Sequence, residues 1–474
     1  MSTPPENRFQ GRAPYAPPMA PGRNDRTAVA TYGGQVDDAW STQAIMRMPQ
    51  PDPEARSRTA RTIVIWVIVG LLVLLMGITL LVVGVQLIAL QVPAREGLLA
   101  VLLSAVPLTW ITAVIVWFDR WKPQPIPFIV AAVLWGAAVA VLATFLLSFI
   151  ADRVVATTVG VPFTADPILA PVVSAPIIEE FTKGLFLVVL VLGFRKYFEG
   201  PLDGWMYGTL AGAGFAFTEN ILYLGRASTE GLAALGMLFV LRGVLSPLIH
   251  SAFTAAAGMS IGLAARRGAW WTALIMWIPG LCVGMLLHGM WNGVSTIVSA
   301  RVPQQGTLGL VVTIGVVVVM SAVLSCAWFT VGLVLRHQEA KHTRTMLTDY
   351  AKAGWMTPRE VQMLGTWKGR RAGRRWAKKY PGAKKEMARL VRMGAHLAGV
   401  RERVVSGIGG DKEKETETYL LEKFTRQRKL LQHRVNTAGA AGHGSGGPGS
   451  GGPRSAPPRV PVQAGFTPPD RWSR

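Results

Sequence analysis

The stretch LAPVVSAPIIEEFTKGLFLVVLVLGF, residues 169–194, has the length of a membrane-spanning helix but contains three charged side chains. About 20 mostly apolar residues, rising about 1.5 Å each, cross a bilayer core of roughly 30 Å. Glu179, Glu180 and Lys183 interrupt this run near its middle. Each ionised side chain near the bilayer centre costs roughly 2.5–3.5 kcal/mol on insertion scales, so such residues usually face a polar interior. The stretch therefore predicts a membrane helix that carries part of a polar site.

The rest of the chain has the composition of a polytopic membrane protein. Of its 474 residues, 50% are hydrophobic and 16% are charged, yet the formal net charge is +22, so apolar and basic residues must be concentrated in different segments. Uncharged apolar runs long enough to span a bilayer lie near residues 63–88, 97–118, 127–150, 169–194, 203–224, 235–263, 270–297 and 307–335. We predict an all-α, polytopic membrane helix bundle with about eight transmembrane helices.

The short connecting loops predict the orientation of these helices, because cytoplasmic loops collect Lys and Arg. Alternate loops carry two basic residues each, namely Arg120 with Lys122, Arg195 with Lys196, and Arg266 with Arg267. The loops between them carry one each, namely Arg95, Arg153, Arg226 and Arg301. The pattern predicts a multi-pass protein of the cell membrane with both termini in the cytoplasm.

Changes in composition divide the chain into four segments. Residues 1–60 are rich in Pro, Gly and charge and are predicted to be a disordered cytoplasmic segment. Residues 61–336 form the transmembrane domain. Residues 337–435 are expected to be a basic, partly helical cytoplasmic region, and residues 436–474 a disordered Gly- and Pro-rich tail. No cleaved signal peptide is expected, since the first apolar run starts too late and is too long.

The basic region, residues 337–435, holds 24 Lys or Arg against 10 Asp or Glu. Its basic residues are interleaved with Trp367, Trp376 and Tyr380. Cations directly after a membrane span are attracted to anionic lipid headgroups, so anionic lipid is the expected partner. Nucleic acid would use the same charges, but no recognised nucleic-acid-binding module accompanies them, so it is not the expected partner.

Strongly polar side chains occur in four consecutive predicted spans, whereas the other four spans have essentially none. In chain order they are Glu179, Glu180, Lys183, Glu219, Asn220, Arg242, His250, His288 and Asn292. At about 1.5 Å per residue, the carboxylates and imidazoles reach similar depths, biased toward the outer leaflet. We therefore expect them to share one cavity.

Two imidazoles, carboxylates and an amide are the groups of a catalytic metal site. Imidazole and carboxylate are standard zinc ligands, and a catalytic zinc site uses about three of them. The predicted ligands, expected within one metal-sized neighbourhood, are Glu180, Glu219, His250 and His288. Zinc would lower the pKa of bound water to roughly 7, a second carboxylate would act as general base, and Asn292 would donate to an oxyanion. A serine or cysteine nucleophile fits less well, because no GxSxG element occurs and Cys282 and Cys326 lie apart from the cluster.

Helical spacing distinguishes the two adjacent glutamates without fixing their roles. Glu179 and Lys183 are four residues apart and share a helix face, which allows an ion pair. Glu180 points about 100° away from Glu179. Glu180 would bind metal or activate water, and Glu179 would be its acid–base partner or be held by Lys183; the sequence leaves the order open. It also leaves open whether a metal is required, since a glutamate and a histidine could activate water alone.

Four motifs on consecutive spans resemble those of the PrsW family of intramembrane metalloproteases. They are EEFTK (179–183), FAFTEN (215–220), His250 in HSAFTAAAG, and HGMWN (288–292). The FDRWKPQP sequence after the second span is similar to another element of that family. The related type II CAAX prenyl proteases carry an Arg and a His where this chain has Lys183 and Glu219, which favours the PrsW branch. The resemblance covers roughly residues 100–300.

The resemblance implies an intramembrane metalloendopeptidase that hydrolyses a peptide bond in a membrane-anchored protein near its extracytoplasmic side. A single-span substrate is implied, such as an anti-sigma factor in regulated proteolysis. The residues implied to be catalytic are Glu179, Glu180, His288 and Asn292, with His250 and Glu219 completing the site. Residues 61–336 would then be a protease-like domain.

Two other functions could use the same residues. A proton-coupled transporter also places Glu and His inside the membrane. It would predict inverted repeats and broken helices in both halves of the bundle. Here the polar groups occupy only consecutive middle spans, and Pro247, three residues before His250, marks a single candidate break. A catalytically inactive scaffold that recruits partners through its basic tail is the third hypothesis.

Overall fold

The computed structural model describes residues 16–18, 55–162, 166–266, 270–301, 306–408 and 410–442. Helices make up nearly all of this described part, and no β-strand occurs within it. Contacts divide the chain into a membrane unit, Ser57–His337, and a second unit of Gln338–Arg474 with Met1–Arg56.

The disorder predicted for the two ends concerns residues that lie mostly outside the described ranges. Within these segments residues 16–18 have no regular secondary structure, whereas the first described helix begins at Ala55 and the last described helix ends at Gly442.

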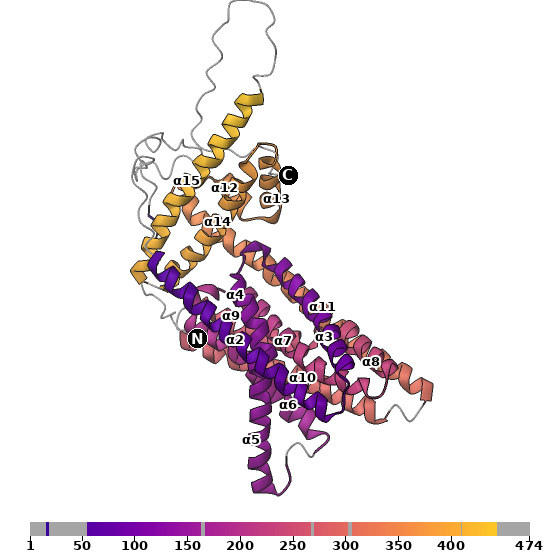
Figure 1. Ribbon diagram of the computed structural model, residues 1–474. Helices are drawn as coiled ribbons and strands as arrows, with labels where there is room; N and C mark the ends of the chain where they lie inside the picture. Colours follow the sequence, from indigo (N-terminus) through magenta and orange to yellow (C-terminus); the bar gives the residue numbers. More distant parts are fainter. Residues whose placement is uncertain are drawn as a thin grey trace, which may run out of the picture. The chain divides into compact units, whose positions relative to one another are not determined.

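Each predicted span of the membrane unit corresponds to a helix or an interrupted helix (Figure 1). The elements are α2 (Ala55–Ala89), α3 (Ala94–Phe118), α4 (Ile126–Leu134), η4 (Trp135–Ala140), α5 (Val141–Val159), η6 (Ala170–Ser174), α6 (Ala175–Gly193), α7 (Pro201–Ser228), α8 (Leu232–Phe239), η8 (Val240–Leu245), α9 (Ile249–Ala265), α10 (Trp270–Arg301) and α11 (Gly306–Lys352). The segments η4, η6 and η8 are π-helical. By length and composition, 6 helices of the described part could cross a membrane; α6 and α7, which carry Glu179, Glu180 and Glu219, are not among them.

Two helices extend beyond their predicted ends. We predicted the last span to end near residue 335, but α11 continues to Lys352, because the polar residues 338–352 include neither Gly nor Pro. Helix α5 continues to Val159, so Arg153 lies in a helix rather than in the expected loop. The orientation of the helices in the membrane stays a prediction.

Helix α7 is the buried centre of the membrane unit and approaches α9 backbone to backbone. Gly204, Gly208 and Gly212 repeat every four residues on the face of α7 that contacts α9. A Cβ atom on Gly204 would lie 1.9 Å from the carbonyl oxygen of Gly258, and one on Gly212 would lie 2.4 Å from that of His250. Small residues permit such close approach between membrane helices. The glycine face therefore determines where His250 lies beside α7.

The π-helical segment η4 packs equally closely against another part of α7. A Cβ atom on Gly136 would lie 1.9 Å from the carbonyl oxygen of Ala211. The Thr218 hydroxyl donates a hydrogen bond of 2.7 Å to the carbonyl oxygen of Ala137. Helix α7 is thus held on two sides, which limits its rotation about its own axis.

Buried polar groups also attach the loop after α3 to α7. The backbone N–H of Gln124 donates to Asp119 at 2.9 Å, and the Gln124 side-chain amide donates to Asp203 at 2.9 Å. The Tyr207 hydroxyl donates to the amide oxygen of Gln124 at 3.1 Å. The FDRWKPQP sequence therefore connects the third helical stretch to the centre of the bundle.

The second unit is a helical domain formed by the end of α11 and four further helices. These are α12 (Pro358–Leu364), α13 (Trp367–Ala377), α14 (Ala383–Val405) and α15 (Gly410–Gly442). Its apolar core includes Leu347, Tyr350, Leu364, Met387, Leu390, Leu421 and Phe424. The TPRE sequence predicts a capping box at Thr357, and this is confirmed: the Thr357 hydroxyl accepts from the Glu360 N–H at 3.1 Å, and the Glu360 carboxylate accepts from the Thr357 N–H at 2.8 Å.

A buried acidic group joins three helices of this second unit. The Tyr350 hydroxyl of α11 donates to Glu417 of α15 at 2.9 Å, and Arg401 of α14 lies 3.5 Å from the same carboxylate. Burial raises the pKa of Glu417, and the hydrogen bond from Tyr350 and the charge of Arg401 oppose that rise. The domain thus has both an apolar core and a buried polar connection.

The close approach of α7 and α9 makes Gly204→Ala a sharp test of the fold. The added methyl group would meet the Gly258 backbone, and such overpacking typically costs about 1–3 kcal/mol. We expect a clearly lower thermal midpoint in detergent. Gly77→Ala on α2 is the matched control, since its methyl group would meet nothing within 4 Å. Equal midpoints for the two variants would contradict the packing described.

Candidate functional site

Four helices bring the polar residues of the predicted site together. Glu179, Glu180 and Lys183 come from α6, Glu219 from α7, His250 from the first turn of α9, and His288 from α10. Helix α9 starts only at Ile249 because residues 246–248 leave the helical path, where Pro247 has no N–H to continue the hydrogen-bond ladder. This break places His250 at a helix start, against the backbone of Gly212.

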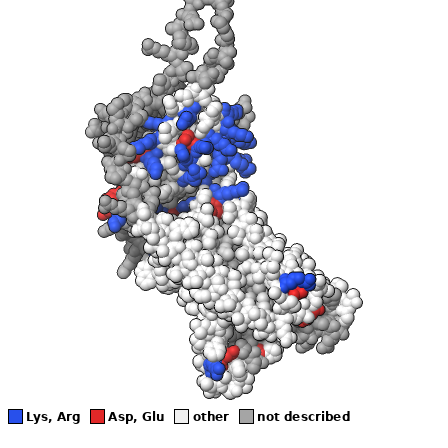
Figure 2. Space-filling view, in the orientation of Figure 1, with Lys and Arg blue, Asp and Glu red and all other residues white. Residues whose placement is uncertain are grey.

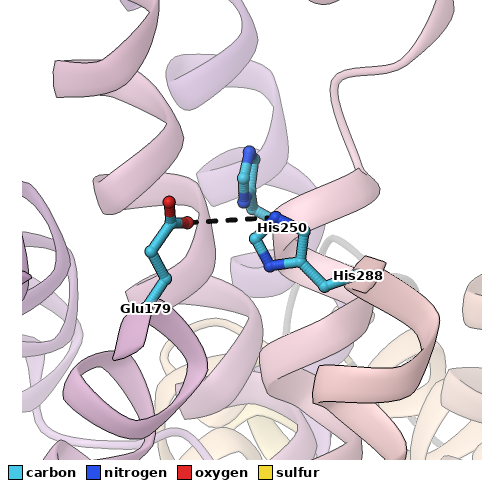
Figure 3. Close-up of side chains that lie close together, drawn as sticks. All are labelled: Glu179, His250 and His288. Atoms are coloured by element: carbon cyan, nitrogen blue, oxygen red, sulfur yellow. Dashed lines mark ion pairs between the residues drawn. The ribbon is translucent and has the colours of Figure 1, made fainter. Parts of the chain in front are cut away.

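The side chains of Glu179, His250 and His288 converge on one point (Figure 3). Each offers a ligand atom, and the three atoms lie within 4.8 Å of one another. The Nε2 atom of His288 lies 3.9 Å from Oε2 of Glu179. The two imidazole rings are perpendicular, with their centroids 5.1 Å apart. Two imidazoles and one carboxylate are the donor set of many catalytic zinc sites, so these residues fit a metal ion.

Glu180 fixes the orientation of His288. Its Oε1 atom lies 3.0 Å from Nδ1 of His288, which donates the hydrogen bond. Its Oε2 atom accepts a hydrogen bond of 2.8 Å from the Thr254 hydroxyl. Because Nδ1 carries the proton, the lone pair of His288 is on Nε2, the nitrogen nearer Glu179. This is the usual arrangement of a metal-binding histidine held by a second carboxylate.

Glu219 fixes the orientation of His250. Its Oε2 atom lies 2.9 Å from Nε2 of His250. Arg242 of η8 forms an ion pair with Glu219, donates from Nε to Asn220 at 2.7 Å, and lies over the Tyr223 ring at 4.1 Å. Each histidine of the site therefore has a carboxylate of its own.

Lys183 is a buried cation that contacts both glutamates of α6 and His250 of α9. It is 0% exposed, and its Nζ atom lies 2.6 Å from Glu180, 3.3 Å from Glu179 and 3.3 Å from Nδ1 of His250. It also lies over the Phe215 ring at 4.2 Å. The predicted ion pair between Glu179 and Lys183 is confirmed. The second bond, to Glu180, was not predicted.

The charges of the cluster do not balance without a further cation. Three carboxylates face two cationic side chains, Lys183 and Arg242. With neutral histidines, one formal negative charge remains in a largely buried place. Such an excess is costly in a low-dielectric interior and favours a bound cation.

Asn292 lies one turn beyond His288 on α10 and contacts η6. Its side-chain N–H donates to the carbonyl oxygen of Pro171 at 2.7 Å. In η6 the N–H of Ala175 bonds to the carbonyl oxygen of Ala170, five residues earlier. With the same spacing of five residues, the carbonyl oxygen of Pro171 would accept from the N–H of residue 176, but that residue is a proline and has no N–H. Asn292 replaces that missing donor with its side-chain amide. The oxyanion role expected for it stays a prediction.

The sequence identified the residues of the cluster but not all of their pairings. We expected Glu180 and Glu219 beside both histidines, whereas each contacts one histidine and Glu179 lies beside both. Thr254 was missed, because a threonine in an apolar helix gives no signal of its own. Arg242, one of the polar residues of the predicted spans, pairs with Glu219.

A helical membrane domain with a buried carboxylate–histidine centre is the architecture expected of an intramembrane metalloprotease. Residues 124–324 match the profile described as PrsW family intramembrane metalloprotease. A 179-residue stretch is 28% identical to Protease PrsW from Geobacillus kaustophilus (strain HTA426), covering 37% of this chain and 69% of that protein. No solved structure matches the chain significantly. Both comparisons support the assignment predicted from the motifs: this part of the chain is similar to the PrsW family.

The buried ammonium group gives a prediction about stability. Lys183→Met would leave Glu179 and Glu180 buried without their cation, and breaking a buried ion pair typically costs about 3–5 kcal/mol. We expect a strongly lowered thermal midpoint in detergent, partly restored in Lys183→Met/Glu180→Gln, which removes one uncompensated charge. Lys368→Met, at an exposed position of α13, is the control. If the single and double variants were equally unstable, Lys183 would not act by neutralising Glu180.

Proposed function

We propose that Glu179, His250 and His288 hold one catalytic divalent metal ion, zinc by the preference of its ligands, and that this centre hydrolyses a peptide bond. The observation that carries the proposal is the convergence of three ligand atoms within 4.8 Å. Zinc is favoured because two imidazoles and a carboxylate suit it better than they suit magnesium or calcium. The match of residues 124–324 to a family of metalloproteases supports this proposal.

When bound, the metal would supply a Lewis acid for the scissile carbonyl and a water of lowered pKa. The protein's own residues prepare the site for it. Glu180 accepts an N–H from His288, and Glu219 accepts one from His250, which fixes the orientation of both rings. The other nitrogen of His250, Nδ1, faces Lys183 at 3.3 Å, so metal binding through it would require the ammonium group to move away. Lys183 neutralises Glu180, which keeps that carboxylate an acceptor for His288.

We assign the proton-accepting role to Glu219. A general base must reach the attacking water. Of the two carboxylates outside the triad, the side chain of Glu180 is 1% exposed and has three partners. The side chain of Glu219 is 19% exposed, and Arg242 holds it in place. Glu219 is therefore the carboxylate that can take a proton from water and return it to the leaving amine.

We further propose that the substrate is a single-span membrane protein, cleaved near the extracytoplasmic side. Glu179 follows the start of η6 by nine residues, about 14 Å along the helix. The loop charges assign that end to the outside of the cell. An anti-sigma factor is the substrate class implied by the family resemblance. A proton-coupled transporter has no comparable support from the comparisons.

Metal content and cleavage separate the proposed roles. With a model single-span substrate, we expect Glu179→Gln, His250→Ala and His288→Ala to lose both bound metal and cleavage. Glu180→Gln should retain a site whose metal affinity is about 10- to 100-fold weaker, because it holds His288 rather than the metal. His433→Ala, an exposed histidine of α15, is the control.

Glu219→Gln should weaken metal binding to a similar extent, because Glu219 holds His250. At saturating metal it should still lose cleavage by about 10²- to 10⁴-fold, the usual contribution of a general base, whereas Glu180→Gln should recover. If Glu180→Gln lost all bound metal and Glu179→Gln kept it, Glu180 would be the metal ligand and Glu179 would not. Full cleavage by all site variants would show that the cleavage does not come from this site. That result would end the protease proposal and leave the scaffold hypothesis. Full cleavage after chelation, verified by metal analysis, would mean that Glu179 and His288 activate water without a metal.

The position of the cleaved bond is a separate prediction. Mass spectrometry of the products should place the scissile bond within the outer half of the substrate's span, as the depth of Glu179 requires. A cut in the inner half would show that the orientation predicted from the loop charges is wrong, without affecting the identity of the site residues.

A further inference from the structure

Helix α13, outside the part of the chain that matches the protease family, carries a strongly basic face (Figure 2). Its exposed cations are Lys368, Arg371, Arg374 and Arg375. At 3.6 residues per turn they lie within an arc of about 120°. The exposed residues Lys378, Lys379, Lys384 and Lys385 continue the surface toward α14. We call these eight residues the basic face.

The basic face lacks compensating charge. Residues 367–385 contain no Asp or Glu. Within the described part of the chain, none of the eight side chains forms an ion pair with a carboxylate, whereas Lys414 of α15 pairs with Asp411 at 2.8 Å. Like charges on one helix face repel each other and destabilise it. An anionic partner would remove that cost.

On the side of α13 opposite the basic face, a buried arginine holds the helix to the rest of its unit. Arg370 is 3% exposed and donates from Nε to the carbonyl oxygen of Leu364 at 2.7 Å. Burial lowers its pKa to about 9, and the nearby charge of Glu339 opposes this. Glu339 follows Leu335, the last residue of the apolar run, by four residues of the same helix, or about 6 Å. The link between α12 and α13 packs on the same helix: a Cβ atom on Gly365 would lie 2.8 Å from Cβ of Arg344.

We propose that the basic face binds the headgroups of anionic phospholipids on the side of the membrane where α11 leaves it. Helix α11 runs on from the last apolar run into this domain, so the chain itself tethers the basic face to the membrane, and tethering raises the effective concentration of headgroups. Each cation near an anionic surface contributes to the attraction. Single-stranded nucleic acid is less suited, because its binders present exposed aromatic rings. Here Trp376 packs on Tyr380, with ring centroids 5.4 Å apart.

The test uses the full chain in lipid nanodiscs and a water-soluble amine-labelling reagent read by mass spectrometry. In phosphatidylcholine discs, Lys368, Lys378 and Lys379 should label as fast as the exposed Lys412 of α15. Discs with a third of phosphatidylglycerol should slow labelling of the basic face at least fivefold and leave Lys412 unchanged. High salt should abolish the protection, because it screens the attraction.

Charge variants identify which surface is responsible. Arg371→Gln/Arg374→Gln/Arg375→Gln should restore labelling of Lys378 and Lys379, since each cation removed weakens docking about fivefold. The matched control removes three exposed cations from α15, by Lys412→Gln/Lys423→Gln/Arg426→Gln, and should keep the protection.

Two outcomes would overturn the proposal. One is labelling of the basic face that is the same with and without phosphatidylglycerol. The other is protection in phosphatidylcholine discs by an added RNA oligonucleotide that equals or exceeds that given by phosphatidylglycerol, which would identify a nucleic-acid surface. Because the comparison of lipids uses the unaltered chain, a variant that failed to fold would not prevent a decision.

Discussion

The fully buried ammonium group of Lys183 is the constraint on which the membrane unit depends. An isolated charge in such a place would cost several kcal/mol, so its partners have to be supplied by the surrounding helices. Glu179 and Glu180 come from its own helix, and His250 comes from α9. Through Glu180 the same charge also fixes His288 of α10. Folding the bundle and assembling the site are therefore one event, and a change that weakens one weakens the other.

The sequence predicts the helical architecture well because its two strongest signals are local. Apolar length marks each membrane helix, and Pro247 marks the break before α9. Helix ends are harder to predict from hydropathy. At Leu335 the apolar run stops but helix α11 does not, since polar helix formers continue it to Lys352. The point where a helix passes from lipid into water is visible in the composition of the sequence. The point where the helix ends is visible only where Gly, Pro or a capping residue occurs.

The pairings within the site depend on the rotation of each helix, which the sequence does not fix. Adjacent residues on a helix differ by about 100°, so a rotation of α6 by that angle would exchange Glu179 and Glu180. That rotation is prevented by contacts of Thr182, the residue before Lys183, with two other helical segments. The indole N–H of Trp135 donates to the carbonyl oxygen of Thr182 at 3.0 Å, and the Thr182 hydroxyl lies 3.0 Å from that of Thr144. Residue type and helix could be read from the sequence, but orientation required the packing of α6 against η4 and α5.

The bond from Asn292 to the Pro171 carbonyl ties two positions that are far apart in the chain. An asparagine is needed there only while residue 176 is a proline and cannot supply its own N–H. In natural relatives the two positions should therefore covary. A lineage that regains an ordinary residue at 176 would be free to lose the amide at 292, and one that keeps the proline would not. Such coupled substitution would mark Asn292 as part of the scaffold, even though it lies one turn from a histidine of the site.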